Sequence, residues 1–296
     1  VVVDDHNICG EAPTWDQRNA RLLWVDNEQS LVFQYTPSTG DRIVISRDLQ
    51  TNGIAINRDR RLVLAGFGGL CLWQGQNDYV TLVTHHEDLP LQFNDIIADV
   101  RGRVLAGTLY WGAEGMEREG KLYSIDPSGA VTILDEGIHL SNGLAFSPDD
   151  RTLYYSDSSQ RRIYAYDYDV ETGRASNRRV LVQVPFEEGI PDGMTVDAEG
   201  FIWSAQWYGS QIVRYDPEGK VERRLPMPVQ QVSSLAFGGR ELNELYVTSA
   251  GGSWRSDYAP PGYDFDAPNI GGALYRIRLD IQGRPEHLAN LSATAR

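Results

Sequence analysis

Short apolar runs alternate along the chain with turns rich in Asp, Asn and Gly. The clearest unit spans 190–207, where an apolar run after Asp192-Gly193 is followed by an Asp-Ala-Glu-Gly turn and a second run from Phe201 to Trp203. Strands of period two separated by such turns predict antiparallel hairpins, and Asp192-Gly193 is itself interpreted as a turn. No window holds an apolar stripe at helical spacing over three turns, so an all-β fold is expected.

The hairpin unit occurs six times along the chain. The copies begin at Glu11, Asn52, Asn94, Asn142, Asp192 and Ser233. Each copy is followed by a second half of the same kind, such as the run from Lys121 to Asp126. Four strands per unit at a period of about 40 to 50 residues are typical of β-propeller blades. The sequence therefore predicts a six-bladed β-propeller with four antiparallel strands per blade, forming one domain over residues 1–296.

Segments outside the repeat have predicted roles of their own. Val1 to Val3 precede the first unit and are expected to complete the last blade, which closes the ring and removes exposed sheet edges. The segments 109–120 and 251–272 interrupt the repeat and are expected to be loops. Both carry Trp and Tyr among glycines, as loops that border a binding site often do, although surface ornament is the alternative.

Composition narrows the range of partners. The formal net charge of −14 disfavours nucleic acid and anionic membranes, because phosphate binding needs a basic face. Cys9 and Cys71 are expected to be buried and free, which hints at a reducing compartment. No apolar run approaches transmembrane length and no signal peptide is recognisable, so a cytoplasmic location is expected, with a leader removed before Val1 as the open alternative. A monomer or weak homo-oligomer is expected.

The first residues of the six units carry the candidate chemistry. In a propeller the inner strands all start at the same end of the central channel, so these residues are expected to converge. They bring together two or three carboxylates and up to three amides, but no basic side chain that would neutralise the negative charge. Such a group of carboxylates needs a bound cation or a proton. Carboxylate and amide oxygens suit a hard divalent cation. Glu11 is the strongest single indication, because Gly-Glu-Ala-Pro is poor turn chemistry, whereas Asn-Gly and Asp-Gly are common turns.

These positions resemble the SMP-30/gluconolactonase/luciferin-regenerating-enzyme family, which includes regucalcin. The motifs that carry the resemblance are Gly10-Glu-Ala-Pro-Thr-Trp15, Phe93-Asn-Asp95, Ala106-Gly-Thr108, Ser141-Asn-Gly-Leu144 and Pro191-Asp-Gly-Met194. The resemblance covers nearly the whole chain in the right order. It implies a six-bladed propeller that hydrolyses sugar-acid lactones with one divalent cation, which would be Ca²⁺, Mg²⁺, Mn²⁺, Zn²⁺ or Fe²⁺.

The resemblance also implies roles for individual residues. Glu11, Asn142 and Asp192 would be the metal ligands, and Asp192 would also be the candidate general base. Asn94 and Asp95 would lie at the substrate, with Asn94 orienting the ring during catalysis.

The remaining substrate contacts are expected to differ from those of relatives. Gln92 stands where relatives often have Arg, and Tyr110-Trp111-Gly112 stands where some have an acidic residue. Tyr110 and Trp111 would supply a face for the sugar, and Asn52 is a weaker candidate contact. The sequence thus predicts a metal-dependent lactonase acting on a small-molecule lactone. The alternatives are a phosphotriesterase-like hydrolase on the same metal propeller and a non-catalytic propeller that binds calcium or another metal.

Overall fold

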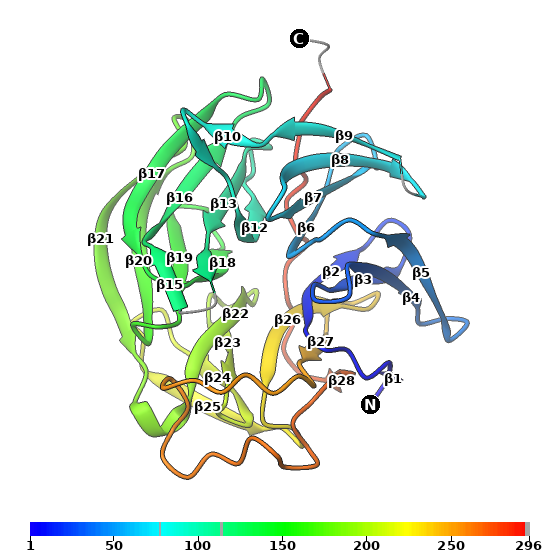
Figure 1. Ribbon diagram of the computed structural model, residues 1–296, viewed down its shortest axis with the longest axis vertical. Coiled ribbons are helices and arrows are strands. Elements are labelled where there is room, and N and C mark those ends of the chain that lie inside the picture. Colours follow the sequence, from blue (N-terminus) through cyan, green and yellow to red (C-terminus); the bar gives the residue numbers. More distant parts are fainter. Residues whose placement is uncertain (77, 113–114, 294–296) are drawn as a thin grey trace.

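Six four-stranded antiparallel sheets stand around a central channel, as the computed structural model in Figure 1 shows. The structure describes residues 1–76, 78–112 and 115–293. Within each sheet the strands follow one another in chain order from the channel outward, except that the last sheet takes its outermost strand from the N-terminus. The predicted six-bladed all-β propeller is therefore confirmed.

Each blade contributes one strand to each of four concentric positions. The inner strands are β2 (Gly10–Asp16), β6 (Gly53–Ile56), β12 (Phe93–Ala98), β18 (Ser141–Phe146), β22 (Ile190–Val196) and β26 (Val232–Gly238). The second strands are β3 (Arg21–Asp26), β7 (Leu62–Gly66), β13 (Val104–Thr108), β19 (Thr152–Asp157), β23 (Ile202–Trp207) and β27 (Glu244–Ser249). The third strands are β4 (Leu31–Thr36), β8 (Gly69–Gly75), β16 (Gly120–Ile125), β20 (Arg162–Asp169), β24 (Gln211–Tyr215) and β28 (Ala273–Arg278). The outer strands are β5 (Asp41–Arg47), β9 (Asp78–Val83), β17 (Val131–Ile138), β21 (Arg174–Gln183), β25 (Val221–Pro226) and β1 (Val3–Asp4).

The N-terminal strand closes the ring as predicted. β1 pairs antiparallel with β28 and places Val3 opposite Leu274. The strand consists of Val3 and Asp4, and the Val2 amide adds a hydrogen bond to the Leu274 carbonyl oxygen at 2.8 Å, whereas Val1 is 75% exposed.

Apolar side chains fill the spaces between neighbouring blades. The described residues form six hydrophobic clusters, and each cluster joins two adjacent blades. In β3, Leu22 and Trp24 pack toward the sixth blade, whereas Leu23 and Val25 pack toward the second. Successive side chains of a strand point to opposite faces, so a strand covered on both faces is apolar at nearly every position. This explains why the second strands appear in the sequence as uninterrupted apolar runs.

Glycines near the start of the inner strands allow the blades to approach closely. A Cβ atom on Gly143 would lie 2.5 Å from the Met194 backbone nitrogen, and one on Gly193 would lie 2.1 Å from the Ser234 Oγ atom. Gly193 lies inside β22 and does not adopt a positive φ angle. The interpretation of Asp192-Gly193 as a turn is therefore wrong, because the glycine serves close packing between strands of adjacent blades.

The two segments that interrupt the repeat differ in structure. Residues 251–272 form no strand and run over one face of the ring, as the orange segment in Figure 1. In the segment 109–120, however, β14 (Tyr110–Gly112) pairs with β15 (Gly115–Arg118). The prediction of a loop there is wrong, because the glycines permit a short hairpin. A second short pair, β10 (His85–His86) and β11 (Leu89–Pro90), connects the second and third blades.

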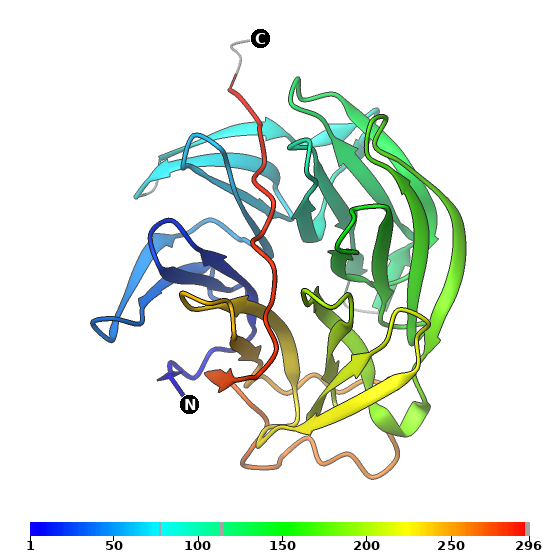
Figure 2. The ribbon, with the colours of Figure 1, turned by 180° about the vertical axis from the view of Figure 1, so that it is seen from behind.

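The C-terminal segment crosses the opposite face of the ring, where it is drawn in red in Figure 2. Backbone hydrogen bonds tie it to several blades, including Gly283 to Leu242, Gln282 to Ala198, and Asn290 to Gly102. Asn57 adds two bonds to the Leu291 backbone, at 2.9 and 3.0 Å. The segment therefore spans the end of the channel that lies opposite the 251–272 loop.

The remaining features agree with the composition. Cys9 and Cys71 are both buried and free, as predicted. The one helical element among the described residues is the short 3₁₀ helix η1 (Phe186–Glu188), and none of the helices described there is long and apolar enough to cross a membrane.

Replacement of Gly143 by Ala should destabilise the protein, because the new methyl group would meet the backbone of Asp192 and Met194. Overpacking of this kind costs about 1–3 kcal/mol of the free energy of unfolding. Gly68 is the matched control, since it is exposed and a Cβ there would meet no atom within 4 Å. Urea denaturation of Gly143→Ala and Gly68→Ala measures the difference. Equal stability of the two variants would refute the packing role of Gly143.

Candidate metal centre

Irregular pairing at the start of the inner strands positions the candidate residues. The register between inner and second strand shifts in five of the six blades. The shifts lie between Glu11 and Thr14, Phe93 and Asp95, Ser141 and Leu144, Pro191 and Met194, and Val232 and Leu235. A bulge bends a strand and turns a side chain out of its regular direction. The predicted site residues Glu11, Asn94, Asn142 and Asp192 all lie at or within these shifts.

Two carboxylates lie close together at this end of the channel, of which Glu11 is partly buried and Asp192 is buried. Burial and the neighbouring Asp95 carboxylate raise the pKa of Glu11 to about 8. Burial, followed by the charges of Glu11 and Asp95, raises the pKa of Asp192 well above its usual value. Asp192 is 3% exposed, and its Oδ1 atom has no hydrogen-bond partner among the described residues. Buried like charges of this kind call for a proton or a cation.

The amide of Asn142 has a defined orientation. Its Nδ2 atom donates to the Ser158 Oγ atom at 2.8 Å, and the Ser158 hydroxyl donates to the Pro191 carbonyl oxygen at 2.6 Å. Because the single hydroxyl proton of Ser158 goes to Pro191, its oxygen must accept from the amide nitrogen of Asn142. The Oδ1 atom of Asn142 accepts one hydrogen bond from Asn94 and keeps a second lone pair for a ligand. Sequence reasoning missed Ser158, which no motif distinguishes from other serines.

Two further asparagines are held by neighbouring blades. The Asn94 Nδ2 atom donates to the Ser141 carbonyl oxygen at 2.7 Å and to the Asn142 Oδ1 atom at 2.9 Å. Asn94 therefore lies directly beside a predicted metal ligand. Asn52 donates to the Phe93 carbonyl oxygen at 2.8 Å and accepts from Gln50 at 2.7 Å, so both ends of its amide are engaged within the protein.

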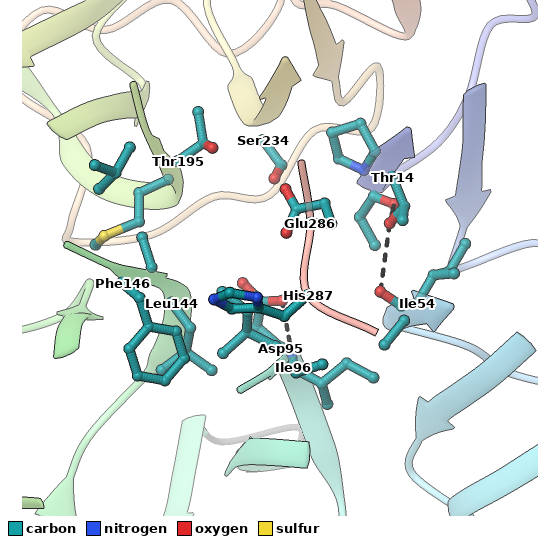
Figure 3. Close-up of a pocket in the computed structure, with 18 of the residues that line it drawn as sticks. Thr14, Ile54, Asp95, Ile96, Leu144, Phe146, Thr195, Ser234, Glu286 and His287 are labelled. Carbon is teal, nitrogen blue, oxygen red and sulfur yellow. Dashed lines mark hydrogen bonds between the residues drawn. The ribbon is translucent and has the colours of Figure 1, made fainter. Parts of the chain in front are cut away.

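Asp95 faces the interior of the channel rather than its open end. It lines a cavity of about 90 Å³ together with Thr14, Ser234 and Glu286 (Figure 3). Burial raises the pKa of Asp95 to about 7, partly offset by the Ile96 amide and increased by the Glu286 charge. Glu286 belongs to the C-terminal segment, which bounds this cavity from the far side.

The other predicted substrate residues surround the start of the β14–β15 hairpin. The Gln92 carbonyl oxygen accepts from the Leu109 amide at 2.9 Å, and the Gln92 side chain is partly buried. Tyr110 is 3% exposed and donates its hydroxyl to the Pro90 carbonyl oxygen at 2.8 Å. Trp111, by contrast, is 41% exposed.

A carboxylate that sequence reasoning missed lies beside Gly112. A Cβ atom on Gly112 would lie 2.2 Å from the Glu117 Oε1 atom, so the Glu117 carboxylate fills the space of a side chain at position 112. The hairpin β14–β15 thus places the carboxylate of Glu117 beside Gly112, in the segment where some relatives have an acidic residue and this chain has Tyr110-Trp111-Gly112. A prediction that these two short strands pair would have placed Glu117 beside Gly112.

The donor set fits a hard divalent cation. Glu11 and Asp192 supply carboxylate oxygens, Asn142 supplies an oriented amide oxygen, and one Asp192 oxygen has no other partner. Among the residues that the structure describes, no group of three or more His, Cys, Asp and Glu side chains is arranged to hold a metal. The candidate centre therefore depends on the amide of Asn142 as much as on the two carboxylates.

The fold and the site define the class of this protein as a six-bladed β-propeller with a candidate cation site, made of oxygen donors, at one end of its channel. Comparison with known proteins identifies its family. The chain belongs to the SMP-30/gluconolactonase/LRE-like family, whose profile matches residues 9–251. It is 38% identical over 288 residues to the pentonolactonase XacC of Haloferax volcanii, covering 96% of each chain.

Solved structures of the family have the same fold. The structure of a luciferin-regenerating enzyme superposes with a TM-score of 0.86 at 29% identity, covering 98% of this chain and 97% of the other. Regucalcin from Agrobacterium tumefaciens, described as a calcium-binding protein, superposes with a TM-score of 0.85 at 26% identity, covering 97% and 96%. The proteins that resemble this chain therefore include one named as a lactonase and one described as calcium-binding.

Protein freed of cations should lose stability as the pH rises from about 5 to about 8. The pKa of Glu11 is about 8 in the folded chain against a reference value of 4.5, so the folded protein keeps a proton that the unfolded chain releases. The stability linked to this proton is complete below the reference value and is lost as the pH rises through the folded value.

Urea denaturation of the chelated protein across this pH range measures the effect. Glu11→Gln should flatten the slope, because the amide does not titrate, and a saturating divalent cation should also flatten it. A chelated protein that is equally stable throughout the range would contradict the proposed crowding of charge at this site.

Proposed function

We propose that this protein is a divalent-cation-dependent lactonase that opens the ester ring of a sugar-acid lactone. The observation that carries the proposal is the convergence of Glu11, Asn142 and Asp192, with one buried Asp192 oxygen that has no partner among the described residues. The 38% identity to a pentonolactonase over nearly the whole chain supports the choice of reaction.

Three side chains would hold the cation. They are Glu11 and Asp192 through carboxylate oxygens, and Asn142 through its Oδ1 atom. When bound, the cation would polarise the lactone carbonyl and offset the negative charge that develops on its oxygen. Asn94 and Ser158 would keep the Asn142 oxygen directed toward the cation, because both contact its amide group.

Asp192 is the proposed general base. Its carboxylate would accept a proton from the water that attacks the carbonyl carbon, and the same proton would pass to the ring oxygen as the ester C–O bond breaks. The product is an open-chain hydroxy acid, in which the water oxygen has become part of the carboxyl group. Since the unpartnered Oδ1 atom is assigned to the cation, the proton would go to the other carboxylate oxygen of Asp192.

Substrate orientation is assigned to the residues around Asn94. Its Nδ2 atom is engaged with Ser141 and Asn142, so its Oδ1 atom would accept a hydrogen bond from a hydroxyl group of the sugar. Gln92, Asp95 and Asn52 stay predicted contacts, although Asp95 lines the interior cavity. Tyr110 and Trp111 stay the predicted sugar face. The similarity to a pentonolactonase favours five-carbon aldonolactones as the first substrates to test.

Lactone hydrolysis by chelated and cation-supplemented protein tests the proposal. A pH-indicator assay would use pentono- and hexonolactones with Ca²⁺, Mg²⁺, Mn²⁺, Zn²⁺ or Fe²⁺. We expect turnover only with a cation, and a loss in kcat/KM of about 100-fold or more in Asp192→Asn, the usual minimum for a removed general base. Asp41→Asn is the matched control, since Asp41 is exposed on the outer strand β5.

Two outcomes would replace this proposal with the other candidates. Cation-dependent turnover of phosphotriesters without turnover of lactones would indicate a phosphotriesterase-like hydrolase. Cation binding without turnover of either class would indicate a binding propeller, as the calcium-binding description of the Agrobacterium regucalcin suggests for that relative.

A further inference from the structure

Two aromatic side chains from distant parts of the chain meet at the rim of the candidate site. Trp111 belongs to the β14–β15 hairpin of the third blade, and Tyr258 belongs to the 251–272 loop that leaves the sixth blade. Their ring centroids lie 6.2 Å apart, with the ring planes at 54° to each other. The two rings therefore form one continuous aromatic surface, although 147 positions separate them in the sequence (258 − 111 = 147).

The hairpin that carries Trp111 starts at the end of the channel where the site residues lie. Phe93 pairs with Thr108, and the Leu109 amide donates to the Gln92 carbonyl oxygen at 2.9 Å. Asn94 is two residues beyond Gln92 and contacts the predicted metal ligand Asn142. The hairpin that carries Trp111 thus begins beside the start of the inner strand that carries Asn94.

Arg161 holds Tyr258 at the end of the channel where the candidate site residues lie. The Arg161 guanidinium donates to the Tyr258 carbonyl oxygen at 2.7 Å and also to the carbonyl oxygen of Gly189, which lies three residues before Asp192. It stacks on the Phe186 ring at 4.2 Å, and burial lowers its pKa. A buried guanidinium that donates to two main-chain carbonyls is a costly feature, and here it fixes the loop to the fifth blade.

The base of the same loop packs against the end of the second strand of the fifth blade. The Tyr208 hydroxyl donates to the Trp254 carbonyl oxygen at 2.9 Å, and the Trp254 ring lies 5.5 Å from that of Trp207. Burial raises the pKa of Tyr208, and the charge of Asp192 contributes to the shift. The loop is therefore held to Trp207 and Tyr208 at its base and beside Trp111 at Tyr258.

The exposure of Trp111 indicates an aromatic surface that is available to bind a ligand. A tryptophan that is 41% exposed leaves a large apolar face in water beside a polar centre, whereas its neighbour Tyr110 is 3% exposed. Binding sites for small polar molecules combine a few directed polar groups with aromatic walls that cover the carbon skeleton. The asparagines and carboxylates supply the polar groups, and the Trp111–Tyr258 pair supplies such a wall.

We propose that Tyr258 is a specificity-determining residue. Together with Trp111 it forms an aromatic wall that contacts the C–H face of the lactone. Arg161 is the residue that positions Tyr258. This inference rests on the proposed lactonase function. The wall binds the substrate and its transition state alike, since it contacts carbon atoms that do not react. Its loss should therefore raise KM and leave kcat nearly unchanged.

Steady-state kinetics on a pentonolactone with saturating cation tests the wall. Tyr258→Ala and Trp111→Ala should each raise KM about tenfold, the scale of one lost aromatic contact, with kcat within about twofold. Tyr258→Phe should behave like the unaltered protein, because the ring rather than the hydroxyl makes the contact. Tyr79→Ala is the control, since Tyr79 is 44% exposed on the outer strand β9 of the second blade.

A double variant tests the role of Arg161. Arg161→Leu should raise KM in the unaltered chain but not in the Tyr258→Ala background, because its effect passes through Tyr258. Additive effects would overturn the positioning role. An unchanged KM in Tyr258→Ala, with turnover intact, would overturn the wall itself. No lactone turnover by the unaltered protein would instead overturn the proposed function, so the two failures are distinguishable.

Discussion

The close approach of six inner strands around one axis is the constraint on which the rest of the structure depends. Neighbouring blades come so near that a methyl group on Gly143 would lie 2.5 Å from the Met194 backbone nitrogen. The bulges at this end of the strands turn polar side chains into the narrow space that remains. Carboxylates that would be solvated on an ordinary sheet are partly or wholly buried here, and the pKa values of Glu11, Asp95 and Asp192 are raised as a consequence.

The same geometry separates the two ends of the channel. The C-terminal segment spans one end and brings Glu286 toward the interior cavity, while the 251–272 loop and the β14–β15 hairpin rise at the other (Figures 1 and 2). The rigid ring thus holds the oxygen donors, and segments outside the repeat supply the rim. Because of this division, rim residues can change without disturbing the packing between blades.

Much of the fold was predictable because the strand pattern is repeated six times. The predicted first residues of the units lie within two residues of the start of their inner strands, as Glu11 and Asn142 illustrate. Gly193 was misinterpreted, since a glycine required for close packing and one required for a turn look the same in sequence. The β14–β15 hairpin was missed because its strands are too short to show a period. Ser158 and Arg161 could not be found, since their roles arise from contacts between blades.

The central claim is that Glu11, Asn142 and Asp192 form one cation site, and an anomalous-scattering map tests it most directly. Crystals of the protein grown with Mn²⁺ would be measured near the manganese absorption edge. The account predicts an anomalous peak bounded by oxygen atoms of these three side chains. A fully occupied peak elsewhere in the molecule, with none at this end of the channel, would contradict it.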